Sequence, residues 1–145
     1  MYEKICAFCG DQTLDLTEYT SKVEAVITDL VENHGYNAFF SGHANDFDIM
    51  CESIVKRLKN KYPNLHLYGV LANGGEFDEV INLKLKLICE YEPEIMAKNR
   101  WMAERSDLTL CCVDRNYGYA WRMKQYAEKL GREIINPVKE MQTMQ

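Results

Sequence analysis

The chain has 145 residues, of which 47% are hydrophobic and 27% are charged, and its formal net charge is −5. This length fits a single domain over residues 1–145, because domains commonly span roughly 100–150 residues. The acidic balance argues against nucleic acid as the main partner, since phosphate binding needs clustered lysines and arginines. No stretch approaches the roughly 20 apolar residues of a membrane span, and the N-terminus lacks the apolar run of a signal peptide. We therefore expect a cytoplasmic protein that neither enters nor binds a membrane.

Short apolar runs alternate with longer amphipathic segments in the first half of the chain. Lys4 to Cys9 is predicted to be a strand, and Tyr19 to Glu32 a helix whose apolar residues recur with helical spacing. A second strand is predicted at Asn37 to Ser41, followed by a helix that begins at Asn45 or Asp46 and ends near Asn60. Leu65 to Leu71 is predicted to be the third strand.

The second half continues the alternation after one ambiguous stretch. Glu76 to Lys86 fits either a loop or a short helix. Pro93 then opens a helix over Glu94 to Arg105, since proline is favoured at the first helical position. The continuous apolar run from Leu108 to Val113 predicts a strand that is buried on both faces. A helix at Tyr119 to Leu130 and a last strand at Glu133 to Asn136 follow.

Strands of this length that alternate with helices predict an α/β fold with three layers. The sheet should be mostly parallel, with about five strands and with helices on both faces. Open sheets of this kind bind ligands outside the carboxyl ends of their strands. The segments that follow the strands are therefore the places to look for a site.

The CxxC spacing of Cys6 and Cys9 suggests a redox pair or a zinc site. Both cysteines lie within an apolar predicted strand, however, whereas redox pairs of this spacing lie at a helix N-terminus. The nearest further zinc ligands, Cys111 and Cys112, are adjacent and would point to opposite faces of a strand. We expect reduced thiols in the core, no metal site and no resident cofactor.

Four strand-to-helix junctions should converge on the ligand-binding edge, and three of them place glycine close to the strand end. They span Cys9 to Gln12, Ser41 to Asp46, Leu71 to Gly75 and Val113 to Tyr119. Glycine lets a ligand approach the backbone, and the free N–H groups of a following helix favour phosphate or carboxylate. The sequence has neither the GxGxxG nor the GxxxxGK[ST] phosphate motif, and it has no GxSxG nucleophile elbow.

Three blocks of the sequence resemble the SLOG superfamily, in particular its YpsA-like branch. Phe39 to Asp48 is similar to the pattern F-x-S-G-G-A-x-G-F-D, and Asn99 to Asp107 is similar to R-N-x-x-M-v-d-x-S-D. Together with Cys9-Gly10 at the end of the first predicted strand, the order and spacing of these blocks extend the match over about residues 3–137. The resemblance implies a Rossmann-like fold and a nucleotide or nucleotide-derived ligand. It also implies a homodimer or a higher homo-oligomer, and it relates the chain to the LOG-type nucleotide phosphoribohydrolases.

The chain departs from the family pattern where the ligand would bind. The first loop lacks the basic residue of F-T-G-H-R, the second glycine of S-G-G-A is His43, and the glycine of G-F-D is Asp46. Tyr117 to Ala120 replaces the G-G-T phosphate loop and keeps one glycine. The glutamate that LOG-type hydrolases carry after that loop has no acidic counterpart in Trp121 to Lys124. A missing carboxylate weakens the case for glycosidic bond cleavage.

Three hypotheses follow. The leading one is a protein that binds a nucleotide or nucleotide-derived small molecule at the carboxyl ends of the strands and could serve as a sensor. The second is a nucleotide N-glycosidase with catalytic candidates His43, Asp48 and Asp114, and the third is a degenerate scaffold. Arg100 fits either ligand contact or a surface ion pair. The ligand-binding candidates are Gly10, Asp11, Ser41, Gly42, His43, Asn99, Arg100, Tyr117, Gly118 and Tyr119.

Overall fold

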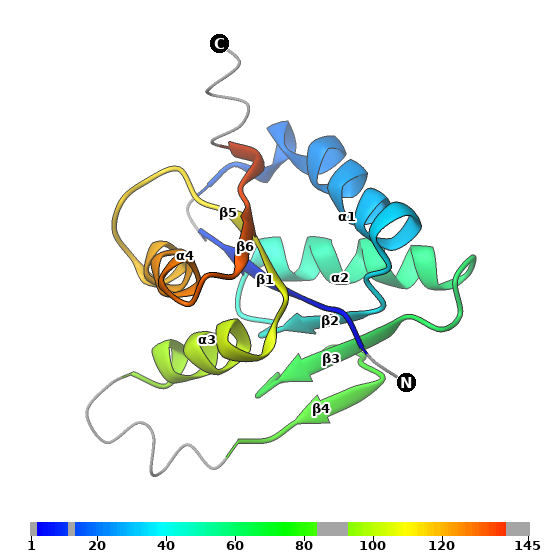
Figure 1. Cartoon of the computed structure of the whole chain (residues 1–145). Helices are drawn as coiled ribbons and strands as arrows, with labels where there is room; N and C mark the ends of the chain where they lie inside the picture. The colour runs from blue at the N-terminus through cyan, green and yellow to red at the C-terminus, as the bar shows by residue number, and fades with distance from the viewer. Residues whose placement is uncertain (1–2, 12–13, 84–92, 139–145) are drawn as a thin grey trace.

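The computed structural model describes residues 3–11, 14–83 and 93–138, and within them six parallel strands form one sheet in the order β4-β3-β2-β1-β5-β6. The strands are β1 (Ile5–Gly10), β2 (Ala38–Ser41), β3 (His66–Val70), β4 (Glu79–Ile81), β5 (Leu108–Cys112) and β6 (Glu133–Ile135). The helices are η1 (Leu16–Glu18), α1 (Thr20–His34), α2 (Asp46–Lys59), α3 (Glu94–Arg105) and α4 (Tyr119–Lys129). The α/β fold class is confirmed (Figure 1).

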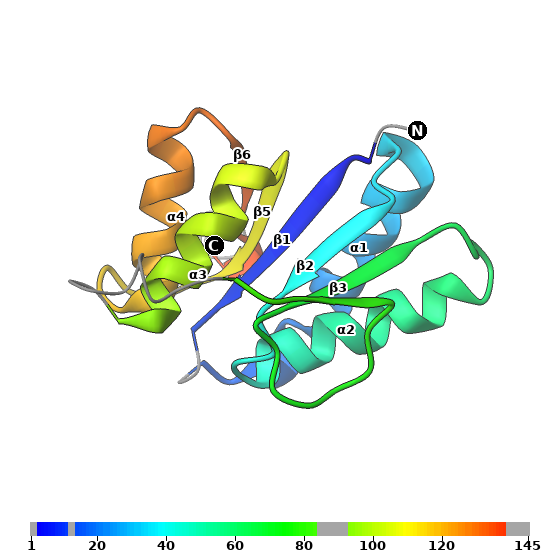
Figure 2. The same ribbon diagram turned by 90° about the horizontal axis from the view of Figure 1, so that it is seen from below.

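Helices cover both faces of the sheet, with α1 and α2 on one side and α3 and α4 on the other (Figure 2). Alternate residues of each strand point to opposite faces, so β1 sends Cys6 and Phe8 toward α1 and α2. Ala7 and Cys9 of the same strand pack on the side of α3 and α4. The central strands are buried on both faces, which explains their continuous apolar runs.

The cysteines of the described residues are free thiols in the core, as expected. Cys6 is fully buried and Cys9 is 4% exposed, and burial raises the pKa of the Cys6 thiol far above its ordinary value. A thiol of this kind remains protonated and behaves as a small apolar side chain. The sixth cysteine, Cys89, lies outside the described residues.

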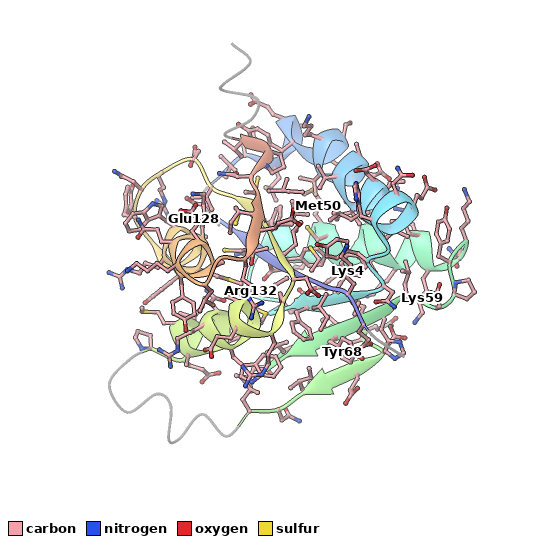
Figure 3. The ribbon with its side chains drawn as sticks, in the orientation of Figure 1. Lys4, Met50, Lys59, Tyr68, Glu128 and Arg132 are labelled. Carbon is pink, nitrogen blue, oxygen red and sulfur yellow. The ribbon has the colours of Figure 1, made fainter. Side chains whose placement is uncertain are left out.

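The additional strand β4 corrects the prediction of a loop or short helix at Glu76 to Lys86, of which residues 84–86 lie outside the described residues. Asp78 aligns the strand, because its Oδ2 accepts from the Leu67 amide at 2.7 Å and its own amide donates to the Leu67 carbonyl. Asp78 also forms an ion pair with Lys59 at the end of α2 (Figure 3). The three residues of β4 are exposed or half-buried, so the sequence shows no alternation of apolar and polar residues there. The bonds of Asp78 position the strand instead.

Helix ends match the residues that the sequence places there. Asn45 caps α2, with its Oδ1 accepting from the Asp48 amide at 3.1 Å. Gly35 ends α1 with a φ of 73°, a left-handed conformation that glycine adopts without strain. The sequence predicts Pro93 at the first helical position of α3. In the structure Pro93 is the N-cap residue, one position earlier, and the helix begins at Glu94.

The strand order reverses at β1. The chain moves outward from β1 through β2 and β3 to β4, and then returns to the other side of β1 with β5 and β6. Doubly wound sheets bind their ligands at such a reversal, because the following loops diverge there and leave a crevice. The crevice lies beyond the carboxyl ends of β1 and β5.

Candidate functional site

A cavity of about 300 Å³ lies at this reversal, beyond the carboxyl ends of β1 and β5. Its walls come from the β1 end, the loop before α2, one side of α3 and the loop before α4. Most of the residues expected to bind a ligand line it: Gly10, Asp11, Gly42, Asn99, Tyr117, Gly118 and Tyr119. Asp48, one of the three catalytic candidates, also lines it.

Gly10 lets the β1 end and helix α2 come into direct contact. A Cβ atom at this position would lie 2.3 Å from the Cβ of Phe47, which is itself buried in the core. The carbonyl of Gly10 accepts from Asn45 Nδ2 at 2.9 Å. Asn45 therefore both caps α2 and joins its N-terminus to the end of β1, which fixes one wall of the cavity.

Gly118 gives the opposite wall its shape. It caps α4 with a φ of 97°, a conformation that residues with a side chain rarely adopt, and as a glycine it gives the first turn no side-chain hydrogen bond. The first amides of a helix carry partial positive charge and attract anions. The α4 N-terminus at the cavity is therefore suited to a phosphate or carboxylate group.

Asp48 is a buried carboxyl group at the cavity wall, only 4% exposed. Its Oδ2 accepts from the Ala44 amide at 2.8 Å. Burial raises the pKa of Asp48 to about 6, although the Ala44 hydrogen bond and the nearby Lys98 ammonium favour the charged form. Asp48 can therefore gain or lose a proton close to neutral pH.

Lys98 supports the cavity wall at Gly42 without lining the cavity itself, and it was not anticipated from the sequence. It is 8% exposed, and its Nζ donates to the Gly42 carbonyl at 2.9 Å. Burial lowers its pKa. The signal for it was present, because aligning R-N-x-x-M-v-d-x-S-D without gaps onto Lys98 to Asp107 puts the basic position at Lys98. Arg100 occupies a variable position of that pattern.

Arg115 is the second cationic residue missed from the sequence. It lines the cavity and forms an ion pair with Asp11, which is 4% exposed. Its guanidinium also lies over the Tyr117 ring, 4.4 Å from the centroid. Asp11 is therefore held by a cation within the same cavity, and Tyr117, 61% exposed, lies at its mouth.

Ser41 and His43 belong to a hydrogen-bond network beneath the cavity and do not line it. Ser41 Oγ donates to Glu52 Oε2 at 2.6 Å, and His43 Nδ1 lies 2.9 Å from Glu52 Oε1. The His43 ring meets the edge of Phe77. His43 has a φ of 51°, so it adopts a conformation that the glycine of the family pattern would reach without strain.

Glu52 was not anticipated, although it is only 3% exposed. It lies one helical turn after Asp48, on the face of α2 that also carries Cys51 and Val55 into the core. A carboxyl group on an apolar helical face is the signal that would have found it. It holds the loop after β2 in place through Ser41 and His43.

Two further candidates lie outside the cavity. Arg100 lines a neighbouring groove and forms an ion pair with Glu104 at 3.8 Å. Asp114 is exposed and borders a separate surface depression. Within residues 3–11, 14–83 and 93–138, no group of three or more potential metal ligands gathers, and no helix has the length and apolar character needed to cross a membrane.

No protein family model matches the chain, and no curated protein matches it in sequence. Several solved structures resemble it, including these two. The X-ray structure of TM1055 matches with a TM-score of 0.63 and 11% identity, over 90% of this chain and 72% of that one. The Moco carrier protein from Chlamydomonas reinhardtii matches with a TM-score of 0.53 and 14% identity, over 92% and 75%.

These similarities show the fold. The Rossmann-like α/β architecture expected from the sequence is confirmed. Its sheet has six parallel strands where about five were expected.

Proposed function

We propose that the cavity at the β1–β5 reversal binds a nucleotide or a nucleotide-derived small molecule. The observation that carries this proposal is the wall at Gly118, where the uncapped N-terminus of α4 opens onto the cavity beside Arg115. Helix amides and a guanidinium together are suited to a phosphate group. One structural neighbour is named as a Moco carrier protein, and a binding role for this chain is in keeping with that name.

The rest of the cavity suits the nucleoside part of such a ligand. Ligand sites commonly measure roughly 300–1,000 Å³, so a cavity of about 300 Å³ fits one nucleotide unit. Asn99 supplies an amide donor and acceptor, and the Tyr117 and Tyr119 rings offer stacking surfaces for a base. The carboxyl groups of Asp11 and Asp48 accept hydrogen bonds from hydroxyl or amino groups.

Calorimetric titration with mono-, di- and cyclic nucleotides and with ADP-ribose tests the proposal. We expect saturable binding of at least one of them. Arg115→Ala should weaken the binding of that nucleotide by about tenfold or more, because a charge-assisted hydrogen bond contributes roughly 1.5–3 kcal/mol.

The control is Arg57→Ala, which removes an exposed arginine paired with Glu24 on the α1–α2 side of the sheet. It should leave the affinity unchanged. The absence of binding by any of these nucleotides at millimolar concentration would contradict the proposal.

A second candidate function rests on Asp48 alone. A carboxyl group with a pKa of about 6 in a ligand cavity is suited to general acid or base catalysis near neutral pH. Such a group could serve hydrolysis of an N-glycosidic bond. Incubation with nucleoside monophosphates should then release free base, and Asp48→Asn should abolish the release. If the wild-type protein releases no base, this function is ruled out and binding remains.

The family resemblance also leads us to propose a homo-oligomer in the cytoplasm, with ligand binding serving a sensor role. Sedimentation of the purified protein with and without its nucleotide measures the assembly and its response. A monomer under both conditions would refute this part of the proposal.

A further inference from the structure

A groove between α3 and α4 adjoins the proposed nucleotide cavity. The groove has a volume of about 200 Å³ and shares Asn99 and Tyr119 with the cavity. One face of each helix forms its walls, with Met96, Asn99 and Arg100 from α3 and Tyr119, Arg122, Met123 and Tyr126 from α4. Because two residues line both spaces, one ligand could occupy the cavity and the groove together.

The groove combines apolar walls with two guanidinium groups. Nη1 of Arg122 lies 3.4 Å from the thioether sulfur of Met96, a weak acceptor. Among the described residues, no carboxylate is recorded in an ion pair with Arg122. Arg100 is paired with Glu104 at 3.8 Å, but both side chains are about two-fifths exposed. A negatively charged group at Arg122 would therefore break no ion pair among the described residues.

The α4 N-terminus lies between the two spaces. Tyr119 is the first residue of α4 and lines both of them. The α4 wall of the groove continues from Tyr119 at helical spacing, through Arg122 and Met123 to Tyr126. A ligand that places anionic oxygens at this terminus could thus extend in two directions, into the cavity and along the groove.

The packing of the helix pair keeps the groove in a fixed shape. Beyond α4, Arg132 donates from Nη2 to the Glu104 carbonyl of α3 at 2.9 Å (Figure 3). Met123 of α4 and Met102 of α3 are both buried in the same core cluster. The two groove walls are therefore held together on the core side and at one end.

We infer that the ligand is a dinucleotide, with one nucleotide unit in the cavity, the pyrophosphate at the α4 N-terminus and the second nucleoside in the groove. This inference rests on the proposed function. Tyr119 and Tyr126 offer rings on which a base can stack, and Arg100 and Arg122 complement the negative charge. An apolar substituent on a mononucleotide would use the apolar walls, but it would bring no second phosphate toward the two guanidiniums.

Calorimetry with AMP, ADP and diadenosine diphosphate tests the inference. Diadenosine diphosphate has two identical halves, so its orientation does not affect the result, and ADP controls for the second phosphate. We expect diadenosine diphosphate to bind at least about tenfold more tightly than AMP or ADP, because stacking of its second base in the groove contributes roughly 1–3 kcal/mol. Arg122→Glu should remove this difference and leave AMP affinity unchanged.

The matched control is Arg105→Glu, which makes the same change of charge on α3 at an exposed arginine that stacks on Trp101. It should preserve the preference for diadenosine diphosphate. Tyr126→Ala provides a second test of the groove if Arg122→Glu does not give a folded protein by circular dichroism. Tyr126→Ala should also lower the affinity for diadenosine diphosphate and leave the affinity for AMP unchanged.

The outcomes separate this inference from the proposed function. If AMP binds but diadenosine diphosphate binds no tighter than ADP, the groove is not a second subsite, and the nucleotide cavity stands. Equal losses for AMP and the dinucleotide in Arg122→Glu, or tighter binding of an N6-alkylated AMP than of the dinucleotide, would also overturn the inference. If no nucleotide binds, both proposals fall.

Discussion

Replacing Gly10 with alanine should lower the free energy of unfolding by about 3 kcal/mol, at the upper end of the typical cost of overpacking a core. The added Cβ would lie 2.3–2.5 Å from the Cβ, Cγ and Cδ2 atoms of Phe47. Rotation of the Phe47 side chain cannot relieve the contact at its Cβ, which is attached directly to the helix backbone. Helix α2 would therefore have to move away from β1. Urea denaturation of both proteins measures the difference.

The control is Gly69→Ala in β3, where the added Cβ would lie 2.6 Å from the ring of Phe77. Phe77 is half-buried and the contact involves only ring atoms, so a rotation of the side chain can relieve it. We expect a smaller loss than for Gly10→Ala. If both variants lose the same stability, the direct contact between β1 and α2 is not what requires glycine at position 10.

The second large effect concerns the pH dependence of stability through Asp48. Its pKa is about 6 in the folded protein, compared with an ordinary 3.8. Between these values the folded protein binds the proton more tightly than the unfolded chain does, so the free energy of unfolding falls as the pH rises. One pKa unit corresponds to about 1.4 kcal/mol, which gives a total change of roughly 3 kcal/mol.

Asp48→Asn should remove this loss, because the asparagine side chain stays neutral and its Oδ1 can still accept from the Ala44 amide. At pH 4 the variant and the wild type should have similar stability, and at pH 7 the variant should be more stable by up to about 3 kcal/mol. Thermal or urea unfolding across this pH range measures the difference. A parallel pH dependence in the two proteins would show that Asp48 is not the group responsible.

Asp46→Asn is the matched control, since Asp46 lies on the same turn of α2 but is exposed. Replacing its carboxyl group should leave the pH dependence nearly unchanged.

If Asp48→Asn stabilises the protein, the wild type keeps a buried carboxyl group that lowers its stability. Proteins keep a destabilising buried charge where function requires it, so the same variant should lose ligand binding if Asp48 contacts the nucleotide.

The central part of the fold could be predicted from the sequence because its strands are buried on both faces. The predicted strands Lys4 to Cys9 and Leu108 to Val113 are apolar except for Lys4 and Thr109, and each lies within one residue of the observed β1 and β5 at either end. β4 could not be predicted in this way, because its burial pattern is exposed, exposed and half-buried. Its position depends on Asp78, whose bonds to β3 and to Lys59 are tertiary contacts.

The candidate site was predicted well in position and less well in its charged residues. Glycines near the strand ends predicted the walls at Gly10, Gly42 and Gly118. Gly10 and Gly42 allow a neighbouring side chain to approach closely, and Gly118 adopts a positive φ. Lys98 reaches the wall at Gly42 and Arg115 reaches the cavity through long side chains, whose directions depend on the packing of α3 and on the pair with Asp11. Helical periodicity places such residues on a face and leaves their partners undetermined.

The position of His43 in a glycine-containing loop at the predicted site did not determine the direction of its side chain. The sequence placed it at the presumed site, and the loop is indeed there, but a φ of 51° turns its side chain toward Glu52 and Phe77. The direction depends on Glu52, a residue of the following helix. The ligand role of His43 stays a prediction, and the observed contacts support positioning of the loop.

The reversal of strand order at β1 also determines when the site can exist during synthesis of the chain. β1 pairs with β2 across about 30 residues, but it pairs with β5 across about 100, from Cys6 with Leu108 to Gly10 with Cys112. Pairings between distant residues form slowly because a long loop must close first. A nascent chain that ends before β5 could pair β1 to β4, yet it would leave one edge of β1 open and would have only one wall of the cavity. Ligand binding would therefore be among the last properties that the growing chain acquires.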